Sequence, residues 1–74
     1  MVVGVRQSKR VIEEGRVQIA YLAEDADSFV SVPFIEICKV HNVRLEYVPT
    51  KSALGRMCHI DVPAAVAVEL KPQD

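Results

Sequence analysis

The segment that most constrains the fold is Pro63–Leu70, whose residues PAAVAVEL are almost continuously apolar. A strand of this composition has no polar side to turn towards water, so it belongs in the middle of a sheet that is covered on both faces. Its alanines allow the covering helices to approach closely. The segment therefore predicts an α/β fold in which helices enclose a sheet from two sides.

Three other segments have the composition of strands. Met1–Val3 is a short apolar run, and Val17–Ala23 is rich in β-branched and aromatic residues. Val43–Val48 alternates strictly between apolar and polar residues, which indicates a half-exposed strand at a sheet edge.

Helices are predicted between these strands. One covers Val5–Glu14 and ends at Gly15. A second covers about Phe29–His41, where Pro33 leaves two possibilities open: the helix starts near Val32 with the preceding serine as its cap, or its first turn is bent. With a third helix before the last strand, the order is β-α-β-α-β-α-β. We predict one domain over residues 1–74, a compact three-layer α/β/α sandwich around a four-stranded mixed sheet.

The third helix leads into an apolar loop. Thr50 can cap the helix, and its apolar stripe is formed by Ala53, Leu54, Met57 and Cys58. Lys51 and Arg56 lie off this stripe and can reach an anion, while Ile60 and Val62 leave apolar groups near the surface of the following turn. A basic helix beside an apolar loop is suited to holding one unstacked base next to phosphates. Gly55, inside the helix, indicates either close packing or close approach to RNA.

The charge distribution permits binding to phosphate even though the formal net charge is only −1. Basic residues cluster near the N-terminus and in the third helix, and the acidic residues gather elsewhere. Such a local basic patch can attract RNA, although the same charges are also consistent with an ordinary solvated surface. Because aromatic residues make up only 5% and Trp is absent, a surface of stacked aromatic side chains is excluded.

No catalytic or metal centre is predicted. Cys38 and Cys58 lie in apolar surroundings, which favours buried thiols in a reducing compartment over a disulfide. Together with His41 and His59 they resemble zinc ligands in type, but their spacing matches no compact zinc finger. The acidic run at residues 24–27 is typical of helix caps, and neither a nucleophile nor a phosphate-binding glycine loop accompanies it. We therefore expect no enzyme activity, no cofactor and no metal.

The N-terminus is too short for a signal peptide, and no apolar run approaches the ~18 residues needed to cross a bilayer. The sequence predicts a cytoplasmic protein with no membrane association.

Four short motifs carry a family resemblance. Residues 4–10, 23–27, 54–60 and 62–65 read GVRQSKR, AEDAD, LGRMCHI and VPAA. In this order and spacing the chain resembles the kink-turn-binding L-seven-Ae ribosomal proteins of the L-thirty-e superfamily, in particular their small bacterial members. The resemblance implies RNA binding without catalysis. The RNA would be a kink-turn, a sharply bent helix with tandem sheared G·A pairs and one extruded nucleotide, and the ribosome is a possible partner.

The resemblance also implies roles for the first helix. Gly4 would let the backbone approach the RNA, and Arg6 and Gln7 would reach the edges of the sheared guanines. Arg10 would take the place of the family's basic helix residue, with Lys9 as a basic neighbour. Archaeal members usually have Asn-Glu where this chain has Arg-Gln, whereas bacterial members tend to have a basic residue followed by Gln.

The remaining implied roles lie later in the chain. Asp27 corresponds to an acidic position near the extruded base, and Lys51 and Arg56 would meet phosphate. The loop that covers the base would consist of His59, Ile60, Asp61 and Val62. A glycine is usual at the position of His59, so a positive φ there would strain the histidine.

Two further expectations complete the sequence-based interpretation. The chain starts at the first strand, without the family's leading helix, so one sheet face would be poorly covered, which would favour self-association or lower the stability; a monomer is nevertheless expected. The alternative function is a protein–protein adaptor on the same fold, which predicts an exposed apolar patch at the proposed RNA surface and no affinity for kinked RNA.

Overall fold

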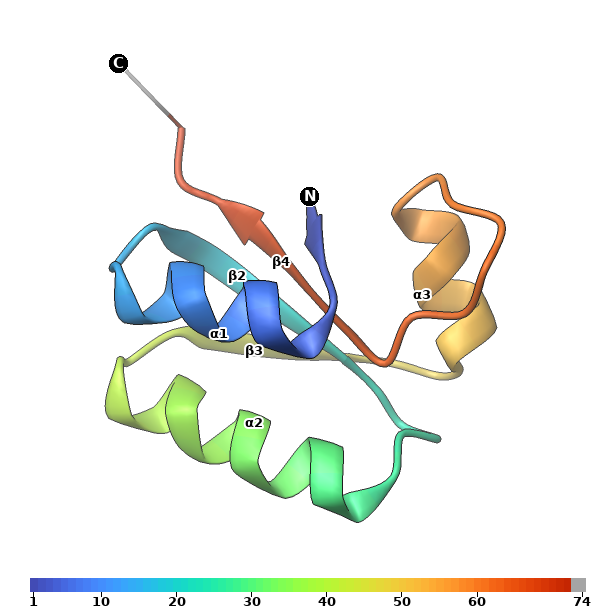
Figure 1. Ribbon diagram of the computed structural model, residues 1–74, viewed down its shortest axis with the longest axis horizontal. Coiled ribbons are helices and arrows are strands. Elements are labelled where there is room, and N and C mark those ends of the chain that lie inside the picture. Colours follow the sequence, from blue (N-terminus) through green and yellow to red (C-terminus); the bar gives the residue numbers. More distant parts are fainter. Residues whose placement is uncertain (73–74) are drawn as a thin grey trace.

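The computed structural model describes residues 1–72 and contains the predicted order of strands and helices. The elements are β1 (Val2–Val3), α1 (Val5–Glu13), β2 (Val17–Ala23), α2 (Ser28–Val40), β3 (Arg44–Val48), α3 (Lys51–Met57) and β4 (Val66–Leu70). Helices α1 and α2 cover one face of the sheet and α3 lies on the other (Figure 1). The predicted three-layer α/β/α sandwich is confirmed.

The sheet has the strand order β1-β4-β2-β3. β4 is antiparallel to both of its neighbours, β1 and β2, whereas β2 and β3 are parallel, so the sheet is mixed as predicted. The central position of β4 and the edge position of β3 are confirmed. Val66, Ala67 and Val68 of β4 are completely buried, because helices cover the strand from both sides.

β4 begins at Val66, not at Pro63 as predicted. Pro63 has no N–H to donate to a neighbouring strand. The next residue, Ala64, donates its N–H to the carbonyl of Lys51 at the start of α3, over 3.0 Å. The segment before β4 is therefore a connection in which Ala64 bonds to the start of α3 and Ala65 bonds to the end of β2, while Pro63 stays exposed.

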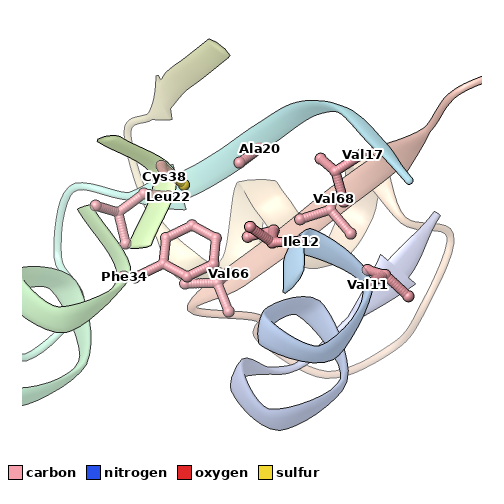
Figure 2. Packing of buried hydrophobic residues seen from close by; sticks show 9 residues of the cluster. All are labelled: Val11, Ile12, Val17, Ala20, Leu22, Phe34, Cys38, Val66 and Val68. Atoms are coloured by element: carbon pink, nitrogen blue, oxygen red, sulfur yellow. The ribbon is translucent and has the colours of Figure 1, made fainter. Parts of the chain in front are cut away.

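The two faces of the sheet carry two separate clusters of buried side chains. The larger cluster lies under α1 and α2 and includes Ile12, Phe34 and Val68 (Figure 2). The smaller cluster lies under α3, where Leu54 packs against Ala67 and other small residues. These small side chains let α3 lie close to the sheet, as the alanines of the sequence predict.

All three helices end in the same way. Gly15, Asn42 and His59 have positive φ values of 72°, 57° and 59°. In each case the N–H of this residue donates to the carbonyl three residues earlier, and the next N–H donates to the carbonyl five residues before it. This pair of bonds is the Schellman motif, which closes the last turn of a helix. The predicted stops at Gly15 and Asn42 are confirmed.

The start of α2 differs from one of the two predicted possibilities. The helix begins at Ser28, with Asp27 in extended conformation before it, and continues through Pro33. A start near Val32 with Ser31 as cap is therefore wrong. Asp27 accepts backbone N–H bonds of 2.9 Å from Val30 and Ser31 at its carbonyl, which closes the first turn ahead of the proline.

One residue of the predicted apolar stripe of α3 is exposed: Met57 is 40% exposed. Leu54 of the same stripe is buried against the sheet, and Gly55 is buried under the loop that follows the helix. No helix within residues 1–72 is long and apolar enough to cross a membrane.

Candidate nucleic-acid interface

The segments that carry the predicted binding residues meet at one end of the sheet. The N–H of Gly4, before α1, donates to the carbonyl of Val66 at the start of β4 over 3.2 Å. The N–H of Ala23, at the end of β2, donates to the carbonyl of Ala65 over 2.9 Å. The turn before α1, the turn after β2 and the loop after α3 therefore lie side by side (Figure 1).

Gly4 is required by its backbone conformation. Its φ of 103° and ψ of 150° lie in a region that is open only to glycine. A Cβ at this position would meet no atom within 4 Å, so conformation and not space excludes other residues. No side chain caps α1, and its first turn holds no acidic residue, which leaves the positive end of the helix dipole available to an anion.

The predicted residues of α1 do not all lie on the same side of the helix. Gln7 and Arg10 line one flank, next to Glu14. Lys9 lies on the other flank, which faces α2, so the structure separates it from Gln7 and Arg10. The Arg10 side chain is 80% exposed, and its Nε is 3.9 Å from a carboxylate oxygen of Glu14. Such a long, exposed ion pair is weak and leaves the guanidinium free to bind phosphate.

Asp25 is a structural residue of this region that the sequence analysis missed. Its carboxylate oxygen Oδ1 accepts the backbone N–H of Lys51, the first residue of α3, over 2.8 Å. No local pattern could reveal this bond, because 26 residues separate the two partners. Asp27, which was predicted to lie near the extruded base, is exposed before α2 and makes no side-chain capping bond.

Helix α3 is held at its start and in its middle. Thr50 accepts the N–H of Ala53 at its hydroxyl oxygen over 3.0 Å, so the predicted cap is confirmed. Gly55 faces the backbone of the following loop: a Cβ here would overlap the carbonyl oxygen of Val62 and lie 3.2 Å from its carbonyl carbon. Of the two explanations for Gly55, close packing within the protein is therefore the one with a structural basis.

The loop after α3 combines basic and apolar groups. Arg56, Ile60, Asp61 and Val62 line a shallow hollow of about 270 Å³. Ile60 is half-buried against the smaller core cluster, whereas Val62 is 61% exposed. Val62 is thus the more exposed apolar surface of this loop.

The thiols are poor candidates for reactive groups. Cys38 is buried, as predicted, and Cys58 is half-buried. Burial raises the pKa of both thiols, and the positive N-terminal amine opposes this rise in part for Cys58. Both thiols are therefore protonated near neutral pH, which disfavours metal binding and nucleophilic attack. Among residues 1–72, no three His, Cys, Asp or Glu side chains are grouped as a metal site.

His59 carries the positive φ that is usual for glycine. We expect His59→Gly to raise the free energy of unfolding by about 0.5–1 kcal/mol, because the cost of a side chain at positive φ exceeds the extra entropy of glycine in the unfolded chain. Urea unfolding followed by circular dichroism measures the change. His59→Ala keeps the Cβ and should give no gain. Equal stabilities of the glycine and alanine variants would contradict this explanation.

The chain is thus a small α/β/α sandwich in which an uncapped helix N-terminus and a loop with basic and apolar side chains lie at one end of the sheet. The chain belongs to the Ribosomal protein L7Ae/L30e/S12e/Gadd45 family, whose model matches residues 1–74. The resemblance noted from the sequence is thereby confirmed.

Several relatives have names that state a binding partner. An RNA-binding protein of Caldanaerobacter subterraneus subsp. tengcongensis is 36% identical over 93% of this chain and 84% of its own length. The small ribosomal subunit protein eS12 of Hordeum vulgare is 37% identical, over 82% of this chain and 46% of its own length. The structure of the Giardia lamblia 15.5kD RNA binding protein superposes with a TM-score of 0.87 at 26% identity. This chain covers 60% of that structure, which in turn covers 96% of this chain.

Proposed function

We propose that this protein binds kink-turn RNA, without catalysis, through the end of the sheet where α1 begins. The observation that carries the proposal is the hydrogen bond between Gly4 and Val66, which holds the head of α1 at the start of β4, directly after the loop that follows α3. One chain thus presents two surfaces of different chemistry next to each other. Relatives with RNA-binding names support RNA as the ligand.

The first surface is the head of α1, which we propose reads the sheared G·A pairs. Gln7 offers a donor and an acceptor in one plane, a pattern that matches the edge of a purine. Arg6 and Arg10 are exposed one turn apart, and with the helix dipole they supply positive charge for the nearby phosphates. Lys9 faces α2 and is left out of this surface.

The second surface is the hollow beside α3, which we propose receives the extruded nucleotide. Val62 provides an exposed apolar group on which a base can rest, and Arg56 in the same hollow is placed to meet the adjoining phosphate. Asp25 and Gly55 serve this surface indirectly, because they fix α3 and the loop in position.

Two substitutions test the two kinds of contact. Gln7→Ala should weaken binding to a kink-turn duplex about 10- to 100-fold, because contacts to a base edge are lost.

Lys51→Ala removes only a side-chain charge, since its backbone N–H still binds Asp25. It should weaken binding to any RNA and lower the salt dependence by about one phosphate contact. Calorimetric titrations at several salt concentrations measure both effects.

The control RNA is a duplex of equal length in which Watson–Crick pairs replace the tandem G·A pairs. Gln7→Ala should leave binding to this control unchanged, whereas Lys51→Ala should weaken it. Equal affinity of the unaltered protein for both RNAs would contradict the proposal, because attraction to phosphate alone does not depend on sequence.

The adaptor function is less well supported. It predicts an apolar patch at the sheet end that carries the basic residues, but the exposed Val62 there shares its hollow with the charged Arg56 and Asp61. Association with the ribosome and a cytoplasmic site of action are part of the RNA proposal, since one relative is a small ribosomal subunit protein.

A further inference from the structure

The outer side of α2 carries an apolar stripe that nothing in the described part of the chain covers. Phe29, Val32 and Val40 are 77%, 63% and 70% exposed, and Pro33 is exposed between them. At 100° per residue these four side chains fall on one side of the helix, with the charged Glu36 in their midst. Exposed apolar groups that line up in this way mark an interaction surface more often than isolated ones do.

A groove runs beside this stripe, between α1 and α2. It has a volume of about 420 Å³, and its apolar lining includes Val5, Ile37 and Val40. Lys9 and Glu13 border it from α1, and Glu36 borders it from α2. None of these three charged side chains forms an ion pair within residues 1–72.

We propose that this face binds a second copy of the same chain in a twofold dimer, with the two α2 helices antiparallel. In this arrangement Phe29 of one copy enters the groove of the other beside Val40, and the twofold axis repeats the contact in reverse. The stripe runs over twelve residues, from Phe29 to Val40, or about 16 Å along the axis, which is enough for three turns of a helix pair. This proposal differs from the monomer that is expected from the sequence.

Charge complementarity favours a second copy over an unrelated partner. Lys9 of one copy meets Glu36 of the other, and the symmetry forms this ion pair twice. A dimer that buries about 1,000 Å² in total needs about 500 Å² from each copy. That is close to a tenth of the 4910 Å² surface of the chain. The shared face lies on the α2 side of α1, whereas Gln7 and Arg10 lie on the opposite flank, so each copy keeps its proposed RNA surface.

Sedimentation velocity from about 1 µM to 1 mM tests this assembly. The unaltered chain should pass from monomer to dimer within this range. Phe29→Glu should raise the dissociation constant about 100-fold or more, because two identical apolar contacts are lost and charges replace them. Tyr47→Glu is the matched control: Tyr47 is an aromatic residue, 55% exposed, on β3, and its replacement should leave the dimer intact.

A charge exchange between Lys9 and Glu36 distinguishes the proposed dimer from nonspecific hydrophobic association. Lys9→Glu and Glu36→Lys should each weaken the dimer about tenfold, and the double variant should recover most of the affinity, because the pair is then restored with reversed signs. A chain that stays monomeric up to 1 mM would overturn the proposal and leave this face to a different protein. A dimer that survives Phe29→Glu, or a double variant weaker than either single one, would overturn it as well.

Discussion

Gly55→Ala is expected to lower the free energy of unfolding by about 2 kcal/mol and to weaken RNA binding along with it. Two effects oppose each other here. Alanine is the better helix former by about 1 kcal/mol. However, its Cβ would overlap the carbonyl oxygen of Val62, and this oxygen belongs to backbone that cannot rotate away. Overpacking of this kind costs 1–3 kcal/mol even among side chains, so the steric term outweighs the propensity.

Urea unfolding gives the stability change, and a kink-turn titration under folding conditions gives the affinity. Ser52→Ala, an exposed change in the same helix, controls for helix propensity and should leave stability nearly unchanged. A more stable Gly55→Ala variant would show that the loop moves aside freely, and that the packing of the loop on α3 does not hold the proposed base-binding hollow in shape.

Ile12→Ala should have a comparable or larger effect on stability alone, with a loss of about 3–4 kcal/mol. Ile12 is fully buried and lies between α1 and the sheet, amid side chains from α2, β2 and β4 (Figure 2). A chain of this size has a total stability of only roughly 4–11 kcal/mol. The variant should therefore unfold at a much lower temperature or populate the unfolded state at 37 °C, which thermal melts followed by circular dichroism would reveal.

Ser8→Ala is the matched control one turn earlier in α1. Ser8 is as deeply buried as Ile12, but its hydroxyl oxygen has no hydrogen-bond partner. Removing an unsatisfied polar group from the core should leave stability unchanged or raise it by about 1 kcal/mol. If both variants lost stability to the same extent, burial of apolar area would not explain the role of Ile12.

Much of the fold was predictable because the relevant forces act within a few residues. The apolar run before Leu70 indicated a central strand, and the alternation in β3 indicated an edge. Thr50 and Asn42 marked a helix start and a helix stop through bonds that span three to five residues. The errors arose where a distant segment competes for the same groups: Pro63 and the two residues after it look like strand but connect to α3 and the end of β2.

The candidate site shows the same difference between local sequence patterns and contacts made by distant segments. The sequence by itself determined which chemistry is present: the basic residues of α1, the apolar loop and a histidine at the position where the family usually has glycine. Only the tertiary structure decided which groups act together. It turned Lys9 towards α2, joined Asp25 to Lys51 and pressed the loop against α3. These contacts depend on the crossing of strands in the sheet, which brings together residues that no local pattern relates.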